Sequence, residues 1–185
     1  MKVFLLLLNV LTLLAGCQGG SRDAETYSFR NLEIKYPSGS MEVSNIQEVP
    51  DKGLVSLLIQ EKKDKLSRIE IGISEFSENF LDTVPQEELL GELAAEVDEM
   101  ERNVSSIPSV SVLEKSEIQW SSPPSRPEAF SFSKIQEDDK IIYLVFSAKI
   151  VGNYCVYSVS RSSNPSTMEV FNDILDTITT KSTNP

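Results

Sequence analysis

Residues 141–146 read Ile141-Ile142-Tyr143-Leu144-Val145-Phe146, an uninterrupted apolar run. Successive side chains of a β-strand point to opposite faces of the sheet, so this strand would present apolar groups on both faces. Strands buried on both faces have this composition. The run therefore predicts a central strand in a sheet that is covered on both sides.

Strand-like segments lie on both sides of this run. Residues 68–76 alternate, with Ile69, Ile71 and Ile73 on one face, which predicts a half-buried antiparallel strand. A shift in the alternation near Arg30-Asn31 indicates a turn or a bulge. Turn residues at 136–140 and 151–153 predict hairpins, and hence antiparallel pairing. Further strands are expected at residues 27–36, 41–46, 54–60, 110–120, 128–136, 141–150 and 154–160.

Two segments have helical periodicity. Residues 85–103 carry an apolar stripe, and a second stripe follows the capping pair Asn164-Pro165. The order β-β-β-β-α-β-β-β-β-α predicts an α+β fold, an antiparallel β-sheet covered by two amphipathic helices. We expect one shared core, formed by Ile69, Ile71, Leu93, Val97, Phe146, Phe171 and Ile174.

A hydrophobic leader opens the chain. Lys2 precedes an apolar stretch that ends in Leu14-Ala15-Gly16-Cys17. Residues 3–16 would span only ~21 Å as a helix, against a hydrocarbon core of ~30 Å, so a signal peptide is favoured over a membrane-spanning helix. A plain secretory signal is the alternative, but it would not need a cysteine at this position.

This leader resembles the signal peptide and lipobox of bacterial lipoproteins. The resemblance implies cleavage between Gly16 and Cys17, and lipidation of Cys17 with a diacylglycerol and an N-acyl chain. Several acyl chains together hold a protein firmly on a membrane. Gln18 follows the cysteine where an aspartate would favour the inner membrane, which implies the outer membrane, facing the periplasm.

The domain organisation follows from the leader and the composition. We expect a signal peptide at 1–16, lipidated Cys17 and a flexible tether at 17–26, one α+β domain at 27–180 and a disordered tail at 181–185. Loss of Lys2 with the leader takes the formal net charge from −11 to −12. So acidic a protein is not expected to bind nucleic acid. The membrane is then contacted through the lipid on Cys17.

The chain has no histidine, which excludes Ser-His-Asp and Cys-His catalysis and histidine-ligated zinc. No glycine-rich phosphate loop occurs either. With Cys17 lipidated, Cys155 has no disulfide partner, and we interpret it as a buried structural thiol rather than a reactive one. We therefore expect no catalytic residue, no metal and no cofactor.

Carboxylates are the abundant reactive groups. One series lies at helical spacing and could form an acid pair or a calcium site, but any solvated helix face has this spacing. A second group could bind calcium weakly, although a hairpin turn explains it as well. The first series is Glu88, Glu92, Glu96 and Glu99, and the second is Glu137-Asp138-Asp139.

Trp120 lies beside the proline-rich segment 121–127, which contains Arg126, and the two residues form a possible contact site, because tryptophan and arginine are favoured interface anchors. The alternative is that Trp120 closes the core at a strand end.

Element order and three short strings resemble the PsbP-like fold, known from an extrinsic photosystem II subunit and a yeast nuclear-import factor. Small envelope lipoproteins of bacteria share this fold. The resemblance implies an α/β/α sandwich over residues 27–180. Metal sites of the photosynthetic branch use histidine, so none carries over. The strings are Phe29…Ile34-Lys35-Tyr36-Pro37, Asp138-Asp139-Lys140-Ile141-Ile142-Tyr143-Leu144 and Val170-Phe171…Ile174…Ile178.

Two functions remain. The favoured one is a lipid-anchored envelope protein that acts as a non-catalytic binding or accessory module for an envelope protein partner. The alternative is a carboxylate-based hydrolase of an envelope substrate such as glycan. A hydrolase requires a cleft with two carboxylates about 5–10 Å apart, one of them with a raised pKa.

The Cys17→Ser variant should stay unprocessed or leave the membrane, because no thiol remains to accept the lipid. Mass spectrometry of the membrane-purified wild type should find the lipid on Cys17. An unmodified Cys17 in that sample would contradict the lipoprotein prediction.

Overall fold

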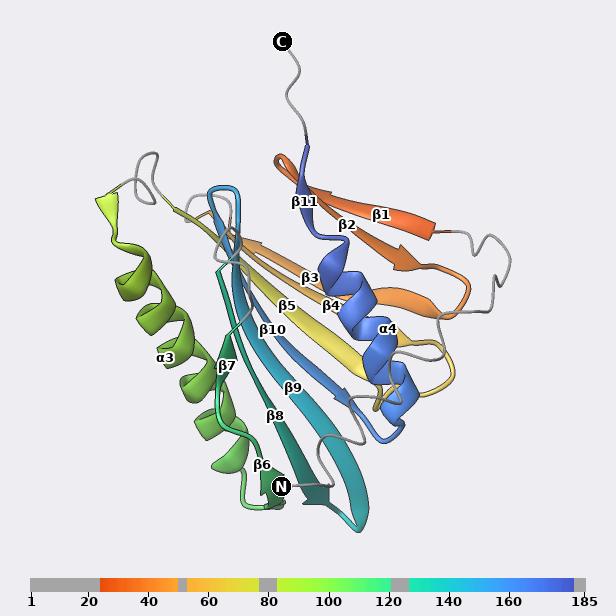
Figure 1. The fold of residues 1–185 in the computed structure, drawn as a ribbon. Coiled ribbons are helices and arrows are strands. Elements are labelled where there is room, and N and C mark those ends of the chain that lie inside the picture. Colours follow the sequence, from red (N-terminus) through yellow and green to blue (C-terminus); the bar gives the residue numbers. More distant parts are fainter. Residues whose placement is uncertain (1–23, 50–52, 77–82, 121–126, 182–185) are drawn as a thin grey trace, which may run out of the picture.

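The computed structural model describes residues 24–49, 53–76, 83–120 and 127–181, which form two antiparallel sheets and two helices (Figure 1). The predicted signal peptide, lipidated Cys17 and residues 182–185 of the tail lie outside the described residues. The strands are β1 (Ala24–Phe29), β2 (Leu32–Pro37), β3 (Met41–Val49), β4 (Leu54–Glu61), β5 (Arg68–Glu75), β6 (Val110–Lys115), β7 (Gln119–Trp120), β8 (Glu128–Glu137), β9 (Lys140–Val151), β10 (Tyr154–Ser162) and β11 (Thr179–Thr180). The helices are α3 (Gln86–Ser105) and α4 (Pro165–Asp176).

The large sheet has the order β3-β4-β5-β10-β9-β8-β6, and β7 also pairs with β8. All its pairings are antiparallel. The apolar run 141–146 lies in β9, between β10 and β8, with Ile142, Leu144 and Phe146 buried on one face. The predicted antiparallel sheet with two helices and a central strand at this run is confirmed.

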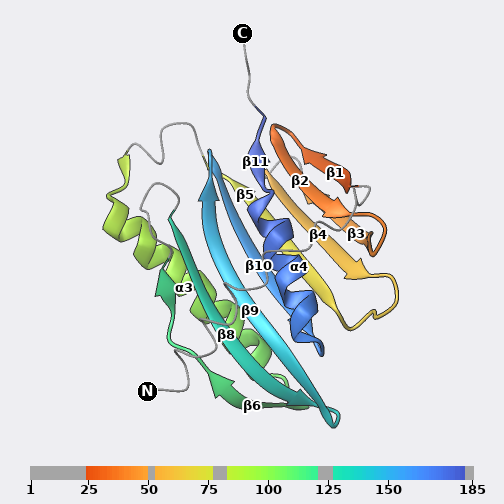
Figure 2. The ribbon, with the colours of Figure 1, turned by 45° about the vertical axis from the view of Figure 1, so that its right-hand side comes forward.

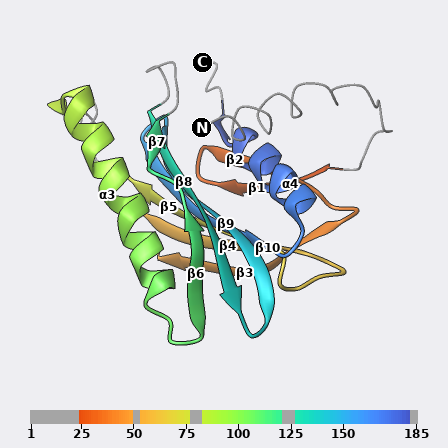
Figure 3. The ribbon, with the colours of Figure 1, turned by 60° about the horizontal axis from the view of Figure 1, so that its bottom comes forward.

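The two helices lie on opposite sides of the large sheet (Figures 2 and 3). Helix α3 packs on β8 and β9, whereas α4 packs on β10 and β9 together with β2 of the small sheet, which has the order β1-β2-β11. Neither helix is long and apolar enough to cross a membrane, within the part of the chain described.

The expectation of one shared core is wrong, because the large sheet separates two apolar clusters. Side chains alternate along each strand, so neighbours in sequence enter different clusters. On the α4 side lie Ile69, Ile71, Phe171 and Ile174, and on the α3 side lie Leu93, Val97 and Phe146.

The structure divides two of the expected strands and moves the start of the domain. The expected strand at 27–36 is a hairpin whose turn contains Arg30 at φ 52°, so the shift in alternation marks a turn. Strand β1 begins at Ala24, which pairs with Pro37, so residues 24–26 belong to the domain and not to the tether. The expected strand at 110–120 is divided into β6 and β7, and both pair with β8.

Polar contacts attach the small sheet to one end of the large one. Arg30 forms an ion pair with Glu75 of β5. The Tyr154 hydroxyl lies within hydrogen-bond distance of two acceptors, Asn31 Oδ1 in the β1–β2 turn and Glu75 Oε1 at 3.2 Å. The carboxylate of Glu75 thus links the turn to β10.

A pair of substitutions in α3 tests how this helix is held. The side chain of Leu93 is buried between α3 and the sheet, so Leu93→Ala should cost about 2–5 kcal/mol of unfolding free energy. Gly91 is exposed with nothing within 4 Å of an added Cβ, so Gly91→Ala should instead stabilise by about 0.5–1 kcal/mol. Urea unfolding followed by circular dichroism measures both, and a loss below 1 kcal/mol for Leu93→Ala would show that α3 does not depend on this contact.

Candidate functional site

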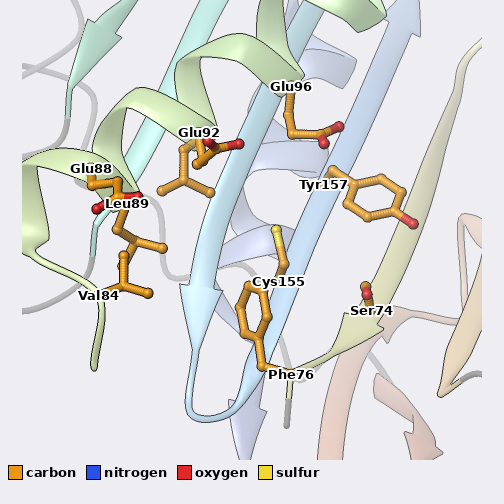
Figure 4. Close-up of a pocket in the computed structure, with 10 residues that line it drawn as sticks. Ser74, Phe76, Val84, Glu88, Leu89, Glu92, Glu96, Cys155 and Tyr157 are labelled. Carbon is orange, nitrogen blue, oxygen red and sulfur yellow. The ribbon is translucent and has the colours of Figure 1, made fainter. Parts of the chain in front are cut away.

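A cavity of about 490 Å³ lies between α3 and the strands β5 and β10 (Figure 4). We call it the α3 groove. The cavity exists because α3 packs mainly on β8 and β9 and makes fewer contacts with β10. The lining residues are Ser74, Phe76, Val84, Glu88, Leu89, Glu92, Leu93, Glu96, Cys155 and Tyr157.

One wall of the α3 groove is acidic. Glu88, Glu92 and Glu96 are exposed, and their spacing of four residues places them along one side of α3. None of the three forms an ion pair with another described residue, whereas Asp98, on the same helix, pairs with Arg102 at 3.0 Å. The predicted solvated face is therefore also the wall of a groove, and Glu99 is not part of its lining.

The floor of the groove depends on the pairing of Tyr157 with Gly72. These residues face each other across β10 and β5, and a Cβ on Gly72 would lie 1.8 Å from Cε2 of the tyrosine. Only glycine leaves room for the ring at this position. Neither residue is predicted as a site residue from the sequence, although an isolated glycine in a strand is a known sign of such close approach.

Cys155 also borders the groove, and it is a free, buried thiol. Burial raises its pKa to about 12, and the negative charge of Glu96 adds to the effect. The pKa of Tyr157 is raised by burial first, and then by Cys155 and Glu96. Because the thiolate is the nucleophilic form, a thiol with this pKa is a poor nucleophile at neutral pH.

A second cavity, of about 660 Å³, is lined by a buried lysine and two carboxylates, among other residues. Lys149 Nζ donates to the carbonyl oxygen of Leu175 at 2.5 Å, at the C-terminal end of α4 where the helix dipole favours a cation. Glu128 faces Lys149 across the β8–β9 ladder, and Asp176 also lines the cavity. Burial raises the pKa of Glu128 and Asp176 adds to this, while Lys149 opposes it.

A third polar group ties α3 to the sheet. Glu101 is buried and accepts a hydrogen bond from Ser133 Oγ at 2.5 Å. Its other carboxylate oxygen pairs with Lys115 Nζ at 2.7 Å. These contacts join α3 to β8 and β6, and removing one partner would leave a buried charge unpaired.

Of the two predicted contact residues, the structure describes only Trp120. Trp120 is 47% exposed on β7, so it does not close the core. On the neighbouring strand β6, Val112 and Leu113 are exposed as well. Arg126, like Gly16 and Cys17, lies outside the described residues. A contact role for Trp120 and Arg126 stays a prediction.

The acidic segment 137–139 is part of a hairpin turn, which was the alternative to a weak calcium site. Asp138 and Asp139 have φ of 47° and 65°, as in a type I′ turn, and Glu137 pairs with Arg161 at 2.5 Å. Over the ranges that the structure describes, no three cysteine, aspartate or glutamate side chains are grouped so that they could hold a metal ion.

No protein-family model matches this chain, and no curated protein matches it. Among solved structures, it is similar to cyanobacterial PsbP (CyanoP) from Synechocystis sp. PCC 6803, with 11% identity and a TM-score of 0.54, over 90% of this chain and 98% of that one. This likeness shows a shared PsbP-like fold. LpqN of Mycobacterium tuberculosis, described as involved in cell envelope biogenesis, matches with 8% identity and a TM-score of 0.49, over 89% of this chain and 87% of that one.

The contact between Gly72 and Tyr157 can be tested directly. Gly72→Ala should destabilise the protein by about 1–3 kcal/mol, because the added methyl group displaces the ring. Combining it with Tyr157→Ala removes the clash, so the double variant should be more stable than the sum of the single effects implies. Simple additivity in urea unfolding would mean that the ring does not lie on Gly72.

Proposed function

We propose that this protein is a lipid-anchored, non-catalytic accessory module of the bacterial envelope, which binds a protein partner near the membrane. The anchor is the lipid on Cys17, and the location is the outer membrane facing the periplasm. The domain belongs to the PsbP-like α/β/α sandwiches. The leader with its lipobox supports the location, and the surface of the described domain supports the mode of action.

The α3 groove is the observation that carries this proposal. Its exposed carboxylates have no cationic partner among the described residues, and its floor is aromatic and apolar. Its one thiol is buried, and its raised pKa keeps it protonated at neutral pH. Such a surface offers charge and apolar area to a partner without an activated nucleophile.

The hydrolase alternative depends on the second cavity. Glu128 and Asp176 are two carboxylates in one cavity, and burial raises the pKa of Glu128, as a general acid requires. Lys149 faces Glu128, however, and its ammonium group favours the ionised carboxylate. The same lysine binds the end of α4, so its position has a structural reason. We therefore favour contact over catalysis.

Crosslinking in intact envelopes, followed by purification of the lipid-anchored protein, tests the proposal. A specific crosslinked partner should be recovered with the wild type. If the edge at β7 makes the contact, the Trp120→Ala/Arg126→Ala variant should lose this partner while its circular dichroism spectrum stays unchanged. Ile46→Ala, which truncates an equally exposed side chain on β3, should keep it.

Two results would count against this picture. Retained crosslinking by the Trp120→Ala/Arg126→Ala variant would remove that edge from the contact surface. Turnover of envelope glycan by the pure protein, abolished by Glu128→Gln, would overturn the binding proposal in favour of the hydrolase.

A further inference from the structure

The acidic wall of the α3 groove has a regular spacing. Carboxylates four residues apart on a helix are separated by about 6 Å along the axis, since each residue rises about 1.5 Å. Glu88, Glu92 and Glu96 therefore present three negative charges in a row of about 12 Å. The lining contains no lysine or arginine to neutralise them.

Beside this row lies an apolar and aromatic strip. Phe76, Leu89 and Leu93 line the groove together with Tyr157, whose ring lies on Gly72. Figure 4 shows Glu92 and Glu96 on the helix, with Cys155, Phe76 and Tyr157 on the sheet side of the cavity. A ligand in the groove would contact the carboxylates of α3 on one side and the aromatic side chains of Phe76 and Tyr157 on the other. Aromatic rings also attract cations.

The spacing of the charges matches that of an extended peptide. Alternate residues of an extended chain lie about 6.6–6.8 Å apart on the same side, close to the separation of the carboxylates. The residues between them point to the opposite side, where they would meet the apolar strip. A compact ion such as Ca²⁺ does not fit as well, because the described residues bring no three acidic side chains together around one point.

We propose that the α3 groove binds an extended basic segment of the partner protein, with lysine or arginine at alternate positions and apolar residues between them. This inference rests on the proposed binding function and names the chemistry of the partner. Its basic residues pair with Glu88, Glu92 and Glu96, and its apolar side chains lie against Phe76 and Tyr157 on the sheet side of the groove.

Fluorescence anisotropy with labelled peptides tests the proposal on the whole protein in a non-ionic detergent. The probe is a short peptide with the core Lys-Val-Lys-Leu-Lys, and its matched control, Lys-Lys-Lys-Val-Leu, has the same composition without the alternation. The alternating peptide should bind at least tenfold more tightly than the control. Binding should weaken as salt is raised, because salt screens the charge pairs.

Two triple variants distinguish peptide binding in the groove from general attraction to the negative net charge of the protein. Glu88→Gln/Glu92→Gln/Glu96→Gln should weaken binding of the alternating peptide at least tenfold. Glu87→Gln/Glu117→Gln/Glu169→Gln removes the same charge from exposed positions outside the groove, and binding should change less than twofold. Equal effects of the two triple variants would show general attraction to an acidic protein and would overturn the proposal.

Two further outcomes decide between occupants. Equal binding of the two peptides, or full displacement by spermine at the same charge concentration, would mean that the groove takes any polycation, and not an extended segment.

The crosslinking experiment separates this inference from the proposed function. If the groove variant still recovers the crosslinked partner, and the wild type does not bind the alternating peptide, this inference is overturned and the proposed function stands. If the wild type neither recovers a crosslinked partner nor binds the alternating peptide, both the proposed function and this inference are overturned.

Discussion

The structure depends on burying both faces of one antiparallel sheet without any covalent support. Cys155 is a free thiol, and the described residues bring together no metal-binding cluster, so apolar burial provides most of the stability. Strand β9 makes this possible, because it presents Ile142, Leu144 and Phe146 to the α3 side and half-buried Tyr143 and Val145 to the other. Each helix then completes one of two cores that share the same strands.

The burial of both sheet faces also determines which charged side chains are paired and which are exposed. Where the sheet is covered, buried charges are paired, as Glu101 is with Lys115 and Ser133, or bound to a helix end, as Lys149 is to α4. Where α3 stops short of β5, the carboxylates of its flank remain exposed and without ion pairs among the described residues. The α3 groove therefore lies over the part of the sheet that α3 does not cover.

Much of the fold could be predicted from the sequence, because periodicity reports which side chains share a face. The run at 141–146 gave the central strand, and the stripes at 89–104 and 171–178 gave both helices. Periodicity does not report which element lies opposite, so Leu93 and Phe171 were assigned to one core although the sheet separates them. The candidate site was harder to predict from the sequence for the same reason. The series Glu88, Glu92 and Glu96 was visible, but only tertiary structure brings Tyr157 and Gly72 beside it.

Helix α3 differs from the strands in how it is attached. Ladder hydrogen bonds fix the spacing between strands, whereas α3 is held on the sheet by side-chain packing and by the contacts of Glu101. Packed helices can slide by small shear movements while the sheet beneath them stays intact. The separation between the acidic row and Tyr157 is thus set by side-chain packing and not by ladder hydrogen bonds. A partner could widen or narrow this space without breaking any backbone hydrogen bond of the sheet.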